Sequence, residues 1–179
     1  MPDYAYLKSD LINTTENDST EFATQIPFFI TKAEFRITKD IDDVGLDEYT
    51  TVSVSSGNAG AVPLNDRVRI VRNVNYTVST GTTVTNLLQR TVEYASDYWP
   101  VSASTGTPRY YSRRTNSSIK IVPTPVSATT VEIQTASQPL ALASATGTSV
   151  TTSNYFSEYC YDALFYGCLI EATMYMKDW

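Results

Sequence analysis

Residues 154–177, NYFSEYCYDALFYGCLIEATMYMK, form the stretch that decides the fold. Hydrophobic side chains recur along it at the spacing of an α-helix, with Ser157 as a plausible cap. One row of this helix contains Tyr161, Leu164, Cys168, Glu171 and Tyr175. The helix is apolar on most of its sides, and such a helix is buried by its own fold, by neighbouring subunits or by both.

Two segments near the start of the chain provide partners for this last helix. Residues 3–13 carry apolar side chains at helical spacing and predict a short helix. After a polar loop at 13–20, a second amphipathic helix of about four turns is expected, with Pro27 at an early helical position and a stop near Gly45. Its apolar face comprises Ile26, Ile30, Ala33, Ile37 and Ile41.

The middle of the chain changes to a period of two, which is typical of strands. Strands are expected within 50–56, 67–72, 108–112, 119–122 and 130–134. A helix is expected over about 85–99, capped by Thr85 and ended by Pro100. Residues 137–152 are rich in Ala, Ser, Thr and Gly, and we expect an exposed loop or flexible hairpin there rather than core.

This order of elements favours an α+β fold, because the alternation is too irregular for a parallel βαβ sheet. We expect residues 1–179 to form a single domain. Its N-terminal and C-terminal helices, about 3–45 and 153–179, form a helical bundle, and an antiparallel β-rich lobe is inserted over about 46–152. No run approaches the roughly 20 apolar residues that span a membrane, and the first residues lack the pattern of a signal peptide.

The composition removes most catalytic chemistries. The chain has no histidine, the commonest general base and metal ligand. Cys160 and Cys168 lie about 12 Å apart along one predicted helix, too far for a disulfide, so two buried thiols are expected. The acidic cluster over 40–48 lacks the ligand pattern of a calcium loop. We expect no catalytic residue, no metal site and no cofactor. The acidic residues over 40–48 are interpreted as solvated charges or as an acidic surface that faces DNA.

The charge and the aromatic residues point to protein surfaces. The net charge of −6 argues against general nucleic-acid binding, whereas 13 tyrosines suit wet protein–protein interfaces. Arg109, Arg113 and Arg114 form a basic patch beside two tyrosines. Such a patch could bind single-stranded nucleic acid, with the aromatic rings stacked on bases. The favoured interpretation is that its arginines form salt bridges to a neighbouring subunit. The predicted interface residues are Arg109, Tyr110, Tyr111, Arg113, Arg114, Tyr175 and Trp179.

Three motifs, in order, resemble those of phage head-to-tail adaptors, including the tail tubular protein A type of short-tailed phages. The first is IPFFITKAEFRI at 26–37. The second couples GTPRYY at 106–111 to IKIVPTP at 119–125, and the third is ALFYGCLIEATMYMKD at 163–178. Each motif alone is weak, but together they cover most of the chain. Members of that family usually carry further residues after the third motif.

The resemblance implies a structural protein of the virion neck that is assembled in the host cytoplasm. Such adaptors form a ring, commonly of twelve copies, that binds the portal protein on one side and the tail nozzle or tail tube protein on the other. Genomic DNA passes through the ring without sequence-specific binding. The resemblance also implies no enzymatic activity and no membrane partner.

Two other functions fit parts of the sequence. A β-rich virion module that binds a receptor or carbohydrate would explain the Thr-, Ser- and Tyr-rich strands, but such modules are mostly all-β and lack long apolar helices. A carboxylate-dependent hydrolase would need two carboxylates that face each other across a cleft. Glycan binding by the isolated chain would favour the first of these alternatives.

Overall fold

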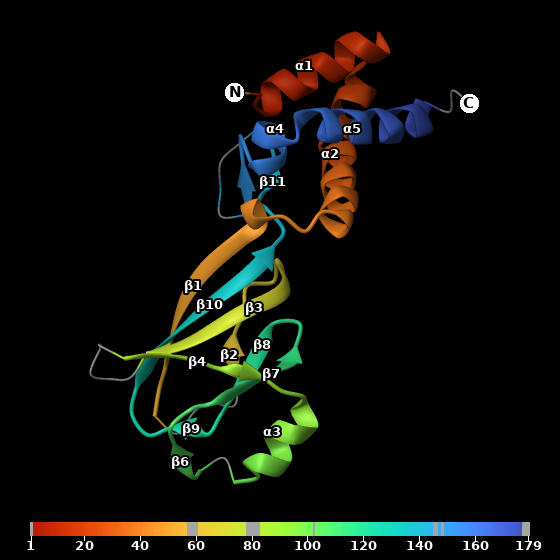
Figure 1. Cartoon of the computed structure of the whole chain (residues 1–179). Helices are drawn as coiled ribbons and strands as arrows, with labels where there is room; N and C mark the ends of the chain where they lie inside the picture. The colour runs from red at the N-terminus through yellow and green to blue at the C-terminus, as the bar shows by residue number, and fades with distance from the viewer. Residues whose placement is uncertain are drawn as a thin grey trace. The chain divides into compact units, whose positions relative to one another are not determined.

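A computed structural model describes residues 2–56, 61–77, 83–101, 103–144, 147 and 149–176 (Figure 1). The chain divides into two compact units. Unit 1 comprises Met1–Leu46 and Gln138–Trp179, and unit 2 comprises Asp47–Ser137. Helices and largely antiparallel sheets together give the α+β fold that the sequence predicts. No helix among the described residues is long and apolar enough to cross a membrane.

Unit 1 is built around helices. They are α1 (Tyr4–Thr15), α2 (Thr20–Asp40), the short 3₁₀ helix η1 (Val44–Leu46), α4 (Tyr155–Tyr159) and α5 (Tyr161–Met176). Two short parallel strands, β11 (Ala141–Leu142) and β12 (Val150–Thr151), complete the unit. The expected docking of the last helix against the early amphipathic helix is confirmed, because α5 packs along α2.

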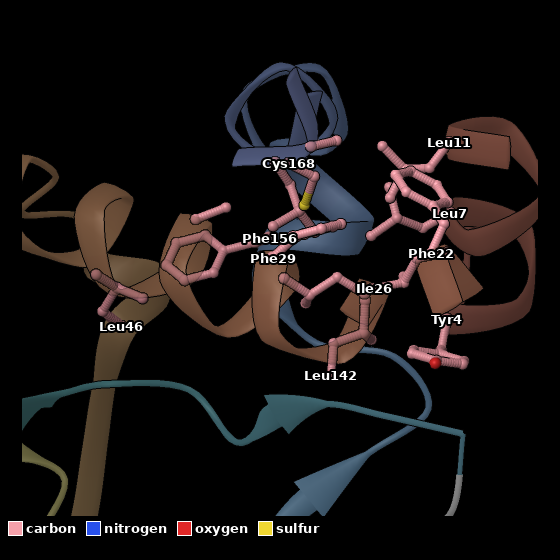
Figure 2. Packing of buried hydrophobic residues seen from close by; sticks show 14 residues of the cluster. Tyr4, Leu7, Leu11, Phe22, Ile26, Phe29, Leu46, Leu142, Phe156 and Cys168 are labelled. Carbon is pink, nitrogen blue, oxygen red and sulfur yellow. The ribbon is translucent and has the colours of Figure 1, made fainter. Parts of the chain in front are cut away.

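The core of unit 1 lies among α1, α2, α4 and α5. Figure 2 shows side chains from these helices pointing toward one another, with Phe22 and Ile26 from α2 and Cys168 from α5. Phe22, Ile26, Phe156 and Cys168 are completely buried. Burial of a large apolar side chain contributes about 1.5–3 kcal/mol, so this core holds the helices together.

Helix α2 begins earlier than its sequence pattern predicts. Ser19 caps it by accepting a hydrogen bond from the backbone N–H of Phe22, so the segment taken as a polar loop contains the first residue of the helix. Pro27 therefore lies inside the helix, and its placement near the helix start is wrong. The interior proline lacks an N–H, and the Thr31 hydroxyl donates to the Pro27 carbonyl.

The C-terminal apolar stretch forms two helices rather than one. α4 ends at Tyr159, Cys160 adopts a non-helical conformation, and α5 begins at Tyr161. Asn154 is the cap, and Ser157 completes a capping box from the third helical position, so the choice of Ser157 as cap is wrong. The predicted row survives on α5, where Leu164, Cys168 and Glu171 are buried.

The described residues of unit 2 form two four-stranded sheets and one two-stranded pairing. The first sheet is antiparallel, in the order β1 (Asp47–Val54), β10 (Thr129–Ser137), β3 (Val68–Thr77) and β4 (Val84–Asn86). The second has the order β2 (Val62–Pro63), β8 (Ser118–Val122), β7 (Tyr110–Thr115) and β5 (Leu88–Gln89). β6 (Thr105–Gly106) pairs with β9 (Thr124–Pro125), and α3 (Val92–Tyr98) packs against β7.

A second core fills unit 2. Val74, Ile119, Ile121, Val131 and Ile133 are completely buried, and they come from strands of both four-stranded sheets. The unit begins at Asp47 and ends at Ser137, and Asp47 pairs with Ala136 in the register of β1 and β10. The two ends of unit 2 therefore lie on neighbouring strands, as an inserted segment requires.

The helix expected over about 85–99 is correct only in its second half. Thr85 lies in strand β4, and Leu88 lies in β5, which pairs with β7. Helix α3 starts at Val92, and the side chain of Thr91 caps it. Residues 84–86 pair with β3 and residues 88–89 pair with β7. These residues are therefore strands and not the helix that apolar spacing alone predicts.

Residues 137–152 were expected to lie outside the core, and this is wrong for their first part. Ser137 ends strand β10, and Leu142 is only 2% exposed within the core of unit 1. Residues 57–60, whose sequence Gly-Asn-Ala-Gly predicts a turn, lie outside the described residues.

Candidate interaction surfaces

The residues of the first and third motifs meet where α2 packs on α5. A Cβ atom added at Gly167 would lie 3.0 Å from the Cβ atom of Ala33, so these two small residues allow the helices to approach closely. These two motifs therefore describe the helical scaffold of unit 1, whereas the second motif lies in unit 2. The first and third motifs also contain exposed side chains, which lie outside this helix contact.

Glu34 is a buried carboxylate that connects three segments of unit 1. Its Oε1 atom accepts hydrogen bonds from the side-chain amide of Asn154 at 2.6 Å and from the backbone N–H of Leu142 at 3.1 Å. Burial raises the pKa of Glu34 to about 7, and the two hydrogen bonds only partly oppose this shift. Glu34 thus fixes the strand β11 and the cap of α4 to helix α2.

Glu171 of α5 is a second buried carboxylate, and it is paired with two cations of α2. Its carboxylate lies 2.7 Å from the Arg36 guanidinium and 3.3 Å from the Lys32 ammonium. Glu171 is 4% exposed, whereas the two basic side chains reach it from the surface. These ion pairs fix the position of α5 along α2 and hold the basic side chains in place.

The outward face of α5 exposes apolar side chains. Tyr166, Ile170 and Met174 follow one another at intervals of four residues and are 64%, 50% and 45% exposed. We call these three residues the α5 outward face. A contiguous exposed apolar stripe of this kind marks an interaction site in a soluble protein.

The outward face of α2 combines aromatic rings with cations. Phe28 and Phe35 are 54% and 51% exposed. The Lys32 ammonium lies 4.4 Å from the ring centroid of Phe28, and the Lys39 ammonium lies 4.2 Å from that of Phe35. These four residues form the α2 outward face. Their spacing of three or four residues is a signal for this face in the sequence, although the predicted apolar face of the helix contains none of the four.

Unit 2 carries an aromatic cluster on α3 and β7. The ring of Tyr110 meets those of Tyr94 and Tyr98 edge to face, at 5.5 and 5.2 Å between centroids. The Arg90 guanidinium lies 5.6 Å from the ring centroids of both Tyr94 and Tyr110. Tyr94 and Tyr98 are each 40% exposed, so the cluster presents aromatic surface to the solvent. Of its members, only Tyr110 was predicted from the sequence.

The structure separates the predicted interface residues. Tyr111 is 2% exposed in the core of unit 2, so its side chain is not available to a partner. Arg113 donates to the backbone carbonyls of Arg69, Val68 and Asn116 and thereby links β7 to β3. Arg109 and Arg114 are exposed.

Two predicted interface residues belong to the C-terminal part of the chain. Tyr175 of α5 is 43% exposed, and its ring packs against Phe29 at 5.5 Å and Phe22 at 6.5 Å between centroids. Trp179 lies outside the described residues.

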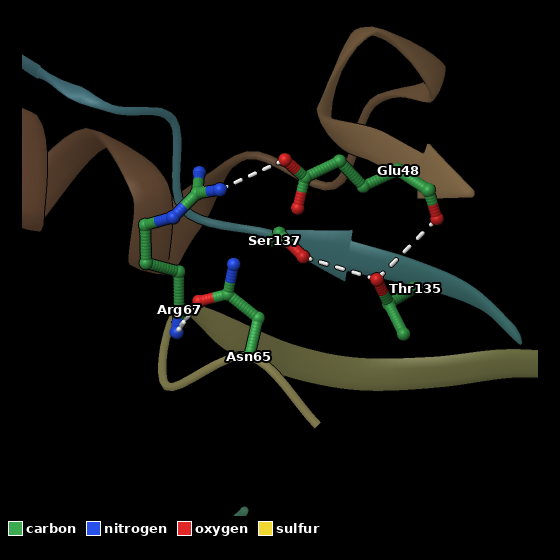
Figure 3. A network of polar contacts seen from close by, with 5 residues as sticks. All are labelled: Glu48, Asn65, Arg67, Thr135 and Ser137. Atoms are coloured by element: carbon green, nitrogen blue, oxygen red, sulfur yellow. Dashed lines mark hydrogen bonds and ion pairs between the residues drawn. The ribbon is translucent and has the colours of Figure 1, made fainter. Parts of the chain in front are cut away.

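Three side chains of the acidic cluster over 40–48 make separate contacts with other side chains. Asp47 accepts from Arg72 at 2.6 Å, and Glu48 accepts from Arg67 at 2.8 Å. Figure 3 shows the second of these pairs beside Thr135, whose hydroxyl contacts the backbone carbonyl of Glu48 and the hydroxyl of Ser137. Asp43 accepts a hydrogen bond from the Tyr155 hydroxyl. Within the described ranges, no group of three residues could hold a metal ion.

The two cysteines are free thiols, as predicted, but only one of them is buried, so the expected burial of both is wrong. Cys168 is completely buried, and burial raises its thiol pKa, so the reactive thiolate is disfavoured. Cys160 interrupts the helix between α4 and α5 and is half-buried.

Comparison with known proteins agrees with the resemblance seen in the motifs. The family model described as SU10 adaptor protein matches residues 3–178, which is nearly the whole chain. A search of curated proteins finds no match. The match supports a phage adaptor, whereas membership of the narrower tail tubular protein A type stays a prediction. The chain therefore belongs to the SU10 adaptor protein family.

Proposed function

We propose that this protein is a structural subunit of a head-to-tail adaptor ring that joins the portal to the tail or nozzle of a phage. The observation that carries the proposal is the family match over residues 3–178. Membership of an adaptor family points to a protein that acts by binding rather than by catalysis. Its place is the neck of the virion, and its assembly takes place in the host cytoplasm.

Unit 1 is the part of the subunit that forms the ring. A closed ring requires heterologous contacts, in which one face of a subunit binds a different face of the next. The outward faces of α2 and α5 differ in chemistry and both expose aromatic or apolar side chains. They therefore support self-association, with twelve copies as the expected number.

Unit 2 supplies the contact with another virion protein. The cluster of Tyr94, Tyr98, Tyr110 and Arg90 joins tyrosine and arginine, which are enriched at the energetic centres of protein interfaces. Arg109, which precedes Tyr110, is also exposed. We assign this surface to the portal or to the tail nozzle or tail tube protein.

The charge of the chain suits a channel through which DNA moves. A net charge of −6 gives little affinity for phosphates, because affinity for DNA requires clustered cations. Arg67, Arg72 and Arg113 are held by contacts within unit 2, which lowers their availability to DNA. DNA that passes through the ring would thus move without being held.

The proposal is tested by mixing the protein with its cognate portal and measuring the mass of the product. A stable ring complex of defined stoichiometry is the expected result. A protein that stays monomeric, with and without portal, contradicts the proposal. Tight binding of glycans by the same protein would instead favour a carbohydrate-binding virion module.

A further inference from the structure

We propose that the α5 outward face of one copy binds the α2 outward face of the next copy. The inference rests on the proposed ring and identifies the two surfaces that close it. It concerns unit 1 alone, and both surfaces consist of described residues.

The two outward faces lie on different helices and outside the contact between them. Helices α2 and α5 pack on each other through Ala33 and Gly167, and the buried row of each helix lies in the core of unit 1. The exposed side chains of each helix lie on a different side of that helix from its buried row. A subunit with two different binding faces has the asymmetry that a head-to-tail contact requires.

The charges of the two faces are complementary. The described residues of unit 1 contain four basic side chains, and three of them, Lys32, Arg36 and Lys39, lie on α2. The α5 outward face has no cation among its described residues, and Glu158 and Asp162 flank it at the α4–α5 junction. Within its own copy, Glu171 pairs with Lys32 and Arg36, and these three groups together keep a net positive charge. An acidic edge on one copy can therefore approach the remaining positive charge on α2 of the next. Such complementarity sets the register of a contact and disfavours the pairing of like faces.

The apolar parts of the two faces also match. Phe28 and Phe35 project from α2, while Tyr166, Ile170 and Met174 project from α5, and all five are at least 45% exposed in the single chain. Aromatic side chains and methionine are enriched in the buried centres of protein interfaces. Covering both stripes in one contact removes the largest exposed apolar side chains of both helices from water. This explains why α5 is apolar on both its inner and outer sides.

Charge substitutions on each face test the pairing directly. Phe35→Glu places a carboxylate on the α2 outward face, and Ile170→Lys places an ammonium on the α5 outward face. Each variant alone should lose the ring at a concentration at which the wild-type protein assembles fully with portal. Both positions are about half exposed, so the melting temperature of the monomer should change little.

Mixing the two variants distinguishes this contact from any other. In a one-to-one mixture, an alternating ring pairs the introduced carboxylate with the introduced ammonium at every second contact and leaves the other contacts as in the wild type. Ring mass should return in the mixture, and it should also return in a chain that carries both substitutions. A mixture of Phe28→Glu with Phe35→Glu alters the same face twice and should stay unassembled. Val44→Glu, at an exposed position outside both faces, should assemble like the wild type.

The outcomes separate the inference from the proposed function. If the wild-type protein forms no ring with portal, the proposed function fails. If the wild type assembles and both single variants assemble equally well, the inference is wrong although the function stands. Loss of assembly in the single variants without recovery in the mixture or in the doubly substituted chain also overturns the pairing of these two faces.

Discussion

The two units divide their apolar side chains between core and surface in different ways. In unit 2, three arginines are held by contacts within the unit, and alternate strand residues point into one core. In unit 1, α2 and α5 bury one side and expose large apolar side chains on the other. Unit 2 therefore buries one side of its strands in its own core and exposes aromatic rings at the cluster on α3 and β7, whereas unit 1 exposes apolar side chains along the same helices that form its core. The apolar content of a helix can thus exceed what its own fold buries.

Two core truncations give the largest expected effects and test whether the cores are separate. Phe156→Ala in unit 1 should cost about 3–5 kcal/mol and Ile133→Ala in unit 2 about 2–5 kcal/mol, because both side chains are completely buried. Hydrogen exchange measures the result, and each variant should lose amide protection mainly in its own unit. Equal loss of protection in both units would show that they unfold as one.

A smaller effect is expected at the contact between α2 and α5. Gly167→Val places a branched side chain against Ala33, where even a single added Cβ lies 3.0 Å from the Cβ of Ala33. Overpacking should lower the free energy of unfolding by about 1–3 kcal/mol. Denaturant unfolding measures this change, and Ala163→Val at an exposed position of the same helix serves as the control. Equal effects of the two substitutions would argue against a close helix contact.

The smallest expected effect is a change in how the stability of unit 1 depends on pH. The pKa of Glu34 is about 7 in the folded chain, above its ordinary value near 4.5, so the folded state binds more protons between these values. This contribution to stability is fully present below about pH 4.5 and is lost as pH rises through 7. In Glu34→Gln, an amide oxygen can still accept from Asn154 and Leu142, and stability should fall less between pH 5 and 8. Thermal unfolding across this range measures the slope.

The control for this prediction is Glu21→Gln on the exposed side of α2. It should retain the slope of the wild type. If Glu34→Gln also retains that slope, the buried carboxyl does not titrate in this window.

The helical packing was the part of the fold that sequence could predict best. The apolar rows of α2 and α5 specify which sides meet, and the structure pairs them. The boundaries were harder, because Pro27 suits a first turn but also fits inside a helix whose Ser19 cap lies eight residues earlier. Thr85 and Leu88 fitted a helical stripe by spacing alone, yet strand partners distant in sequence decided their conformation.

The candidate surfaces were predicted less well than the fold. Tyr110 and Tyr111 are neighbours on one strand, so their side chains point to opposite sides, and only Tyr110 contributes to the exposed cluster. Strand alternation predicts this separation but not which tyrosine faces the core. Arg113 contacts carbonyls of β3 that lie more than 40 residues away in sequence, and no local pattern predicts such a contact. The α2 outward face had a local signal in the spacing of Phe28, Lys32, Phe35 and Lys39.

The most direct test of the central claim is an image reconstruction of the phage neck that resolves this chain. The account predicts a closed ring between portal and tail in which α5 of each copy lies on α2 of the next. A chain found outside the neck, or present there as isolated copies without contact between their helices, would contradict it.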